Sequence, residues 1–441
     1  MTFHARPKPL PAGARTHDWP AFLGPTHDGV AAETKLLRRW PAGGPALVWE
    51  MKTGDGFSSP AIRRDRLVYL HRVGDTARVD CLHPETGLRY WTFTYPATYH
   101  DRYGFNNGPR ASPVIDDGRV YTFGVEGMLH CLDLATGRLI WKVDTTKRFH
   151  VPQNYFGVGS TPLVEGDRLI VQVGGDGGPC VVAFDKTTGE VAWTAGDQWR
   201  ASYASPVPVV VHGRRRVLVF AGGDVRPPTG GLLSIDPATG AIDFRFPFRS
   251  RRYESVNASN PVFAGDRVFL STSYRTGGVL LALAADGKAE VVWKTKDFGA
   301  HFSTPLYRDR CLYGISGSAR NDTAVVCLDW KTGRQLWRHV PEWEETVEHN
   351  GKRDTVSFST FRGAMIYADG RFLLLGELGH LLWVDLTPKG YRELQRARLF
   401  DAGETWCPPV LSRGLLYISQ NRPDHKTGKP PRLLCYDLRG G

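Results

Sequence analysis

Histidine, tyrosine and arginine residues occur at points of the sequence where they could together carry out acid–base chemistry. The four candidates for a catalytic role are His150, Tyr203, Arg275 and His301. A histidine or tyrosine can remove a proton next to a carboxylate, and an arginine can neutralise that carboxylate during the transfer. One interpretation of these residues is therefore an enzyme that acts on carbohydrates, either a polysaccharide lyase or another sugar-modifying enzyme.

A larger set of aromatic, amide, acidic and basic side chains could bind a ligand. Flat rings stack on the CH faces of sugars, and amide and guanidinium groups hydrogen-bond to hydroxyl and carboxylate groups. The same side chains could also line the wet channel of a protein that has no ligand. The candidates for ligand binding are His71, Arg72, Arg110, Asn154, Tyr155, Arg226, Glu254, Asn257, Arg320, His380, Trp406 and Arg422.

The charge of the chain limits its partners. The 441 residues carry a formal net charge of +11, which favours anionic small molecules or polymers. The densest basic runs, at 214–216 and 249–252, are too short for a nucleic-acid-binding arm, so we expect no nucleic-acid partner. No apolar stretch is long enough to span a membrane.

Cysteine and histidine spacing predicts no metal site. The seven cysteines form no CxxC motif and no adjacent pair, and no His-Glu-x-x-His motif occurs. Cys81, Cys131, Cys327 and Cys435 take the same position of a sequence repeat, where other copies have alanine or serine, so we interpret them as small core residues. A divalent cation held between distant residues is left open.

The candidate residues are positioned by a repeat. Each copy contains an apolar run ending in Asp, then Thr-Gly, then Trp, and the glycines at 87, 137 and 189 lie 50 and 52 residues apart. A small-Ser/Thr-Pro motif, such as Ser58-Ser59-Pro60, precedes each copy except the seventh, which lacks the proline. Eight copies can be aligned in this way.

Each copy contains four short runs of β-branched and aromatic residues, separated by turn residues. Four strands repeated eight times predict an all-β, eight-bladed β-propeller of four-stranded antiparallel blades. The last copy lacks a fourth strand, and residues 46–51 have the sequence of one, so we expect this N-terminal strand to close the last blade. Residues 1–45 are then an N-terminal arm, and residues 46–441 form the propeller domain.

Antiparallel pairing assigns the loops to two faces. The turns between strands one and two, and between strands three and four, share one face, while the remaining loops and the blade connections share the other. Variable loops on a rigid framework often carry function, and the opening of the axis on that face is the default pocket. Three connections there, at 94–108, 144–159 and 341–357, are longer than closure of the ring requires.

The repeat resembles the tryptophan-docking motif of pyrroloquinoline quinone (PQQ) propellers and PQQ-like repeat proteins, over residues 46–438. Residues 18–25 also look like the opening segment of many bacterial proteins of this group. The resemblance implies that the tryptophan of each fourth strand packs on the neighbouring blade, at Trp49, Trp91, Trp141, Trp193, Trp293 and Trp337.

Two features of the cofactor-using dehydrogenases in that family cannot be found in this chain. The dehydrogenases have an adjacent Cys-Cys disulfide above the quinone, and they have a calcium site with an Asp base. We therefore expect no PQQ and no other organic cofactor. The remaining branches are similar to the propeller lipoprotein of the outer-membrane assembly machinery and to secreted propellers associated with carbohydrate use.

These observations together predict an exported bacterial protein that binds a carbohydrate or another anionic ligand on its loop-rich face. The alternatives are a carbohydrate-active enzyme and a noncatalytic scaffold for protein assembly, which would have a protein partner. Residues 1–20 contain no apolar stretch typical of a signal peptide. The expected location, in the periplasm or outside the cell, therefore rests on the resemblance.

Overall fold

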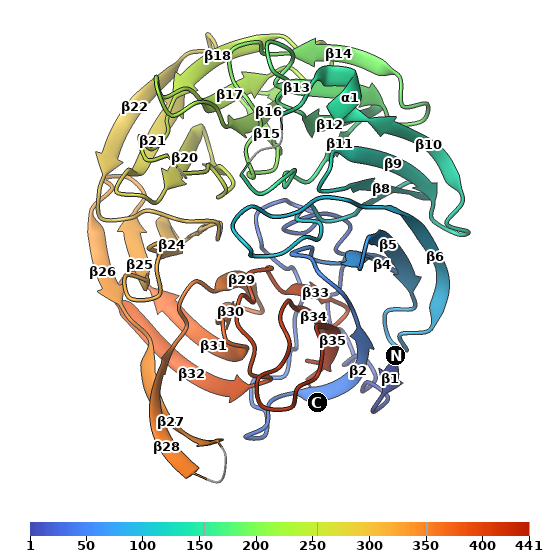
Figure 1. Cartoon of the computed structure of the whole chain (residues 1–441). Coiled ribbons are helices and arrows are strands. Elements are labelled where there is room, and N and C mark those ends of the chain that lie inside the picture. The colour runs from blue at the N-terminus through green and yellow to red at the C-terminus, as the bar shows by residue number, and fades with distance from the viewer. Residues whose placement is uncertain (153–154, 254, 350–351, 441) are drawn as a thin grey trace.

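Antiparallel sheets follow one another around a central axis in the computed structural model (Figure 1). The structure describes the chain apart from residues 153–154, 254, 350–351 and 441, and apart from the side chains of 348–352. Eight sheets form the ring, so the prediction of an all-β, eight-bladed propeller is confirmed.

The first four blades use strands in chain order, from the axis to the rim. Their strands are β3 (Ala61–Arg63), β4 (Arg66–Val73), β5 (Thr76–Leu82) and β6 (Arg89–Pro96); β7 (Val114–Asp116), β8 (Arg119–Phe123), β9 (Met128–Asp133) and β10 (Leu139–Asp144); β11 (Leu163–Glu165), β12 (Arg168–Gln172), β13 (Val181–Asp185) and β14 (Val191–Ala195); β15 (Val207–Val211), β16 (Arg214–Ala221), β17 (Gly231–Ile235) and β18 (Ile242–Pro247).

The next three blades follow the same order, and the last blade joins the two ends of the chain. Their strands are β19 (Val262–Ala264), β20 (Arg267–Thr272), β21 (Gly277–Leu283) and β22 (Ala289–Thr295); β23 (Leu306–Arg308), β24 (Cys311–Ser316), β25 (Ala324–Asp329) and β26 (Gln335–His339); β29 (Ala364–Ala368), β30 (Arg371–Leu375), β31 (His380–Thr387) and β32 (Gly390–Arg398); β33 (Val410–Ser412), β34 (Leu415–Gln420), β35 (Arg432–Asp437), β2 (Ala46–Lys52) and β1 (Thr2–Phe3).

The N-terminal strand closes the ring as expected. Strand β2 pairs antiparallel with β35, and Trp49 lies opposite Cys435 in this pairing. Strand β1 then adds a fifth strand at the outer edge of the same sheet. Strand β2 thus covers the edge of β35 and gives the last blade its fourth strand from the start of the chain.

Two of the long connections contain secondary structure. The connection after β10 begins with the short helix α1 (Thr145–Phe149). The connection after β26 forms the hairpin of β27 (Glu342–His349) and β28 (Lys352–Ser359), which projects from the ring in Figure 1. The base of the hairpin is held by Glu345, which accepts hydrogen bonds from the Trp343 indole and from His380 of β31.

The segment before β2 runs across the face that carries the short turns. Trp19 forms a backbone bridge with Ile62 of the first blade, and Val30 forms one with Tyr367 of the seventh. The carboxylate of Glu33, which is 1% exposed, accepts the backbone N–H of Gly414 in the eighth blade at 2.6 Å. The backbone N–H of Ile115 in the second blade also donates to the carbonyl of Pro20 at 2.9 Å, and a Cβ built on Gly29 would lie 2.9 Å from Leu306 of the sixth blade. Because the second and sixth blades lie on opposite sides of the ring, the segment crosses the axis.

The small-Ser/Thr-Pro motifs form a belt of hydrogen bonds around the axis. In each bond, the backbone N–H of one motif donates to a side-chain oxygen of the motif in the next blade. These bonds join Ser59 to Ser112, Ser112 to Thr161, Thr161 to Ser205, Ser205 to Asn260, and Asn260 to Thr304, at 2.8–3.1 Å. The residues immediately before each motif are therefore held next to the axis.

Each fourth-strand tryptophan contacts a turn of the following blade, and one of these contacts can be tested. The Trp91 indole N–H donates to the carbonyl of Leu134 at 2.9 Å, and a Cβ at Gly137 would lie 2.6 Å from the Trp91 ring. We expect Gly137→Ala to lower the free energy of unfolding by about 3 kcal/mol, because strain at positive φ and a steric clash add together.

Gly118 provides the matched control for this experiment. Gly118 has φ +77°, close to the +73° of Gly137, but no atom lies within 4 Å of a Cβ built there. Gly118→Ala should therefore cost only the backbone strain, about 1 kcal/mol. Equal losses in urea denaturation of the two variants would show that the packing of Trp91 on the next blade contributes nothing.

Candidate functional site

A cavity of about 310 Å³ lies on the propeller axis, on the face opposite the short turns. The belt holds Phe57, Tyr203 and Phe302 at its wall, just before their Ser/Thr-Pro motifs. Trp406 lies beside them before Cys407-Pro408, and the carbonyl of Pro408 accepts the hydroxyl of Ser59 at 2.8 Å. Pockets of this size and apolar lining typically hold small organic ligands. We call this cavity the axial pocket.

Aromatic rings surround Trp406 in the axial pocket. Its ring centroid lies 5.2 Å from that of Phe57 with the planes nearly parallel, 5.7 Å from that of Phe105, and 5.2 Å from that of Phe302. Phe156 continues the wall, at 5.9 Å from Phe105. Such a wall favours a flat, aromatic ligand, since ring pairs gain energy beyond the burial of their surface.

Phe22 forms the floor of the axial pocket. It belongs to the N-terminal segment that crosses the turn face, and its neighbours Ala21 and Leu23 are buried while its own side chain is partly exposed. The axial pocket therefore ends at this segment instead of continuing through the ring.

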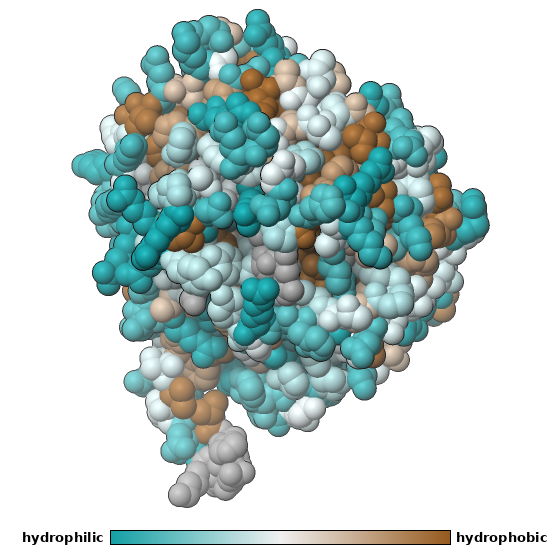
Figure 2. All heavy atoms as spheres, turned by 45° about the horizontal axis from the view of Figure 1, so that its top comes forward, coloured by the Kyte–Doolittle hydropathy of each residue, from teal (hydrophilic) through white to brown (hydrophobic). Residues whose placement is uncertain are grey.

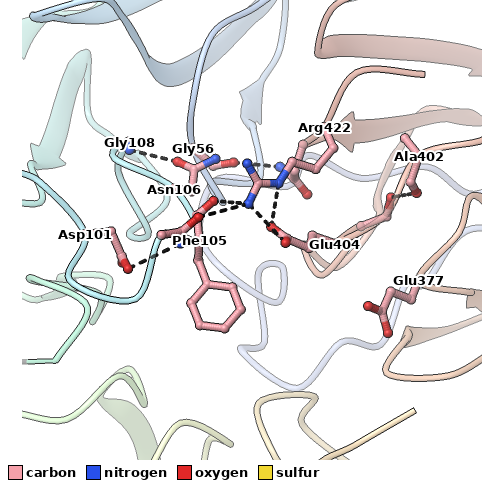
Figure 3. A network of polar contacts seen from close by, with 12 residues as sticks. Gly56, Asp101, Phe105, Asn106, Gly108, Glu377, Ala402, Glu404 and Arg422 are labelled. Atoms are coloured by element: carbon pink, nitrogen blue, oxygen red, sulfur yellow. Dashed lines mark hydrogen bonds and ion pairs between the residues drawn. The ribbon is translucent and has the colours of Figure 1, made fainter. Parts of the chain in front are cut away.

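The connection at 97–109 lies over the axial pocket, and we call it the strap. It leads from β6 to the second blade and contributes the rings of Tyr103 and Phe105 to the lining. Figure 3 shows Arg422 of the last blade donating to the carbonyl of Phe105 and, at 2.8 Å, to the carboxylate of Glu404. The strap thus links the first two blades to the last blade, which is the neighbour of the first in the ring.

Arginines supply the positive charge of the axial pocket. The Arg362 guanidinium lies 4.8 Å from the Trp406 ring, and it donates to the buried carboxylate of Glu377 at 2.8 Å. Arg320 contacts the same carboxylate at 3.2 Å. Burial would raise the pKa of Glu377, but hydrogen bonds and charge from Arg362 and Arg320 hold that pKa below its ordinary value. Two arginines against one carboxylate leave one positive charge in excess.

His301 and Tyr274 form a hydrogen-bonded pair in the lining. The Tyr274 hydroxyl lies 2.8 Å from Nε2 of His301. Burial, together with the charge of Arg362, lowers the pKa of His301 to about 4, so the imidazole is neutral at pH 7. Tyr203 accepts the backbone N–H of Phe156 at 2.8 Å, and burial raises the pKa of its hydroxyl above the ordinary value.

The structure brings four of the sequence-predicted residues together. Arg110, Tyr203, His301 and Trp406 line the axial pocket. Arg110 also donates to Asp101 of the strap at 2.6 Å. Arg110, Tyr203 and Trp406 directly precede the Ser/Thr-Pro or Pro-Pro motifs, and His301 lies one residue further upstream.

The other predicted residues that the structure describes do not line the axial pocket. Some have side chains held by neighbouring groups: His71 by Asp80, Arg72 by the carbonyls of Tyr99 and Asn107, Tyr155 by the carbonyl of Tyr253, Asn257 by the carbonyl of Ala221, Arg320 by Glu377, His380 by Glu345, and Arg422 by Glu404. His150 ends helix α1, and Arg226 and Arg275 are exposed. Asn154 and Glu254 lie outside the described residues.

Sequence reasoning missed several lining residues. Phe57 and Phe302 lie beside the same motifs, so applying the motif rule to every neighbouring position would have found them. Arg362 follows the motif copy that lacks a proline. No local signal marks Phe22 and Phe105, because they reach the axial pocket by contacts between distant parts of the chain.

Within the described residues, no group of three or more His, Cys, Asp or Glu side chains could hold a metal ion. The described part of the axial lining contains no carboxylate. In the same part of the chain, no helix combines the length and apolar character needed to cross a membrane. Figure 2 shows a largely hydrophilic surface with scattered hydrophobic patches.

Comparison with known proteins identifies two kinds of relative. Residues 75–339 match the family described as outer membrane protein assembly factor BamB. The dehydrogenase subunit of a quinone alcohol dehydrogenase from Gluconacetobacter polyoxogenes is 26% identical over 273 residues, which are 55% of this chain and 35% of the relative. A quinohemoprotein alcohol dehydrogenase from Pseudomonas putida is 31% identical over 144 residues, which are 32% of this chain and 20% of the relative. The chain thus spans about a third or less of the curated relatives it matches.

Solved structures share the fold at low sequence identity. BamB from Moraxella catarrhalis superimposes with a TM-score of 0.59 and 15% identity, over 90% of this chain and 99% of that one. A europium-containing methanol dehydrogenase gives a TM-score of 0.69 and 12% identity, over 96% and 98% of the two chains.

These relatives correct two expectations. The prediction of a carbohydrate-binding protein, and the carbohydrate-active enzyme offered as its alternative, are wrong, because the relatives and structural neighbours are quinone enzymes and BamB. The expectation that the chain takes no cofactor is overturned by the same quinone enzymes. The first error has a physical source, since arginines and aromatic rings that suit an acidic sugar also suit a flat ring that carries carboxylates. The second came from treating an adjacent Cys-Cys pair and a calcium site as requirements for the cofactor.

Proposed function

Since the chain belongs to the family described as outer membrane protein assembly factor BamB, and its curated relatives are quinone enzymes, we propose that its axial pocket binds a quinone cofactor of the PQQ type. The observation that carries this proposal is the aromatic wall around Trp406 with Arg362 beside it. The propeller would then serve as the cofactor-binding unit of a redox protein.

The residues of the axial pocket fit the chemistry of such a ring. PQQ is a flat, fused ring system that carries three carboxylates. Trp406 and Phe302 supply flat apolar surface, and Arg362, which shares the single charge of Glu377 with Arg320, supplies a positive charge for a ligand carboxylate. When bound, the quinone would supply an acceptor for two electrons. Phe22 and the strap would shield it from water on two sides.

The described lining does not fit a metal ion held next to the cofactor. No described carboxylate lies in the axial pocket, and Glu377 is occupied by Arg362 and Arg320 behind its wall. Divalent calcium requires several oxygen ligands, usually including carboxylates. We therefore propose that the quinone binds here without a metal.

Titration with PQQ tests both parts of the proposal. Quenching of tryptophan fluorescence should saturate at one PQQ per chain, with the same Kd in EDTA and in calcium. Phenanthrenequinone, a flat quinone without carboxylates, should bind about tenfold more weakly, because it lacks the charged hydrogen bonds to arginine. Absence of saturation under all conditions would refute quinone binding, and saturation only in calcium would refute metal-free binding.

The same family membership supports a location outside the cytoplasm. Assembly of outer membrane proteins, named in the family description, takes place on the periplasmic side of that membrane, and a protein partner is in keeping with this family. We therefore propose the periplasm as the location. Release of the native protein with the periplasmic fraction of its host is the expected result, and recovery only with cytoplasmic markers would contradict it.

A further inference from the structure

The strap closes the axial pocket, and we propose that Arg422 is the positioning residue that keeps it closed, so that the strap acts as the entry gate for the ligand. This inference rests on the proposed function for the identity of the ligand. The gate itself can be tested without any ligand.

The two ends of the strap are firmly attached to the first two blades. The Asp101 side chain is fully buried, pairs with Arg110 at 2.6 Å, and accepts the backbone N–H of Tyr103 at 2.8 Å. Arg72, which is also buried, donates to the carbonyls of Tyr99 and Asn107. These buried, charge-assisted bonds make the ends of the strap fixed points.

The tip of the strap is attached to the last blade through Arg422. The Arg422 guanidinium donates to the carbonyl of Phe105 and, at 3.5 Å, to that of Gly104. The same guanidinium is held by both carboxylate oxygens of Glu404, at 2.8 and 3.0 Å (Figure 3). Arg422 and Glu404 thus form a latch between the tip and the last blade.

The latch lies outside the lining of the axial pocket, whereas the Phe105 side chain that it positions belongs to that lining. Neither Arg422 nor Glu404 lines the cavity, whereas Phe105 does, and Phe105 packs 5.7 Å from Trp406. Release of the Phe105 carbonyl would free this ring to leave the wall. The latch therefore controls access to the axial pocket without contacting a ligand in it.

The surroundings of the strap leave room for movement. No atom lies within 4 Å of a Cβ built on Gly104 at the tip. A second cavity, of about 360 Å³, lies beside the first part of the strap and is lined by Thr98, Tyr99 and Thr146. The rings of Tyr103 and Phe105 pack on Phe156 and Trp406, so opening of the strap must break these ring contacts as well as the latch. Open space at Gly104 and free volume near the base favour such a local opening over global unfolding.

Stopped-flow binding of PQQ to Arg422→Gln is the kinetic test. Loss of a charge-assisted latch should raise both the association and the dissociation rate constant by about tenfold, while Kd changes less than threefold. Glu404→Gln should act in the same direction. The matched control is Arg215→Gln, which removes a similar bidentate pair with Glu165 on another blade and should leave both rates unchanged.

Hydrogen exchange of the ligand-free protein gives the second measurement. Backbone amides at 103–106 should exchange about tenfold faster in Arg422→Gln than in the unmodified protein, while amides of β9 keep their rates. Unchanged exchange at the tip would overturn the gate. If exchange at 103–106 rises in Arg422→Gln but PQQ does not bind the unmodified protein, the role of the latch is supported and the proposed quinone binding is refuted.

Discussion

Replacement of Trp406 with alanine is expected to weaken PQQ binding by about 100-fold. The indole contacts Phe57, Phe105, Phe302 and Arg362, so its removal takes away one flat surface and loosens the side chains that form the others. Stacking of a flat ligand on an aromatic side chain contributes roughly 1–3 kcal/mol, and the upper part of that range corresponds to this loss.

Trp406→Phe is the control for the Trp406 experiment. A phenyl ring retains a flat surface in the same place, so we expect a loss of less than tenfold in affinity, measured by isothermal titration calorimetry. Circular dichroism should show that both variants keep the β-sheet content of the unmodified protein. Equal affinities of Trp406→Ala and the unmodified protein would place the ligand elsewhere and contradict the proposed axial pocket.

The fold could be predicted because its determinants are local and repeated. A strand pair needs only alternating apolar residues and a turn, and the Thr-Gly turns at 137 and 189 recur with the tryptophans that they contact. Even the closure of the ring was visible, because residues 46–51 retain the sequence of a fourth strand that the last copy lacks. The hairpin at 342–359 was missed, since its sequence has no counterpart in the repeat.

The axial pocket could be predicted only where the repeat reaches it. His301 and Trp406 were found because the belt fixes the residues that precede each motif. Elsewhere the residue type alone is a poor guide. His71 and His380 are polar, yet both side chains are buried, His71 against the carboxylate of Asp80 and His380 against that of Glu345 in the hairpin. Burial and partners, which decide between structural and ligand-binding roles, depend on contacts that spacing does not encode.

Asp80→Asn is expected to lower the free energy of unfolding by about 3 kcal/mol. The Asp80 side chain is fully buried in the first blade and accepts hydrogen bonds from His71, Arg78 and Thr92. Arg89 lies 3.0 Å from the same carboxylate. An amide of the same shape keeps part of this bonding, but it loses the charge-assisted hydrogen bonds and places an NH2 donor against the donors of His71, Arg78 and Thr92 at a buried position, which is costly.

The pH dependence of stability provides an independent check on Asp80. Burial alone would raise the pKa of Asp80, but hydrogen bonds from His71 and Thr92 and the charge of Arg89 hold that pKa below the ordinary 3.8. A depressed pKa in the folded state stabilises the protein above the ordinary value, and this contribution is lost as the pH falls through the folded pKa. Asp80→Asn should therefore lose less stability than the unmodified protein on acidification below about pH 4.

Asp286 supplies the matched control for the stability loss expected in Asp80→Asn. It pairs with Lys288 at the surface, where solvent screens the interaction, so Asp286→Asn should unfold at the same urea concentration as the unmodified protein at pH 7. A loss in Asp80→Asn no larger than that in Asp286→Asn would mean that the buried network adds nothing to stability.

The network also contains the Nδ1 of His71, which accepts the backbone N–H of Gly54 just after the closing strand β2. Loss of this network in Asp80→Asn would therefore loosen the contact between the last and first blades. Hydrogen exchange of residues 52–55 should then rise in Asp80→Asn before that of the other blades.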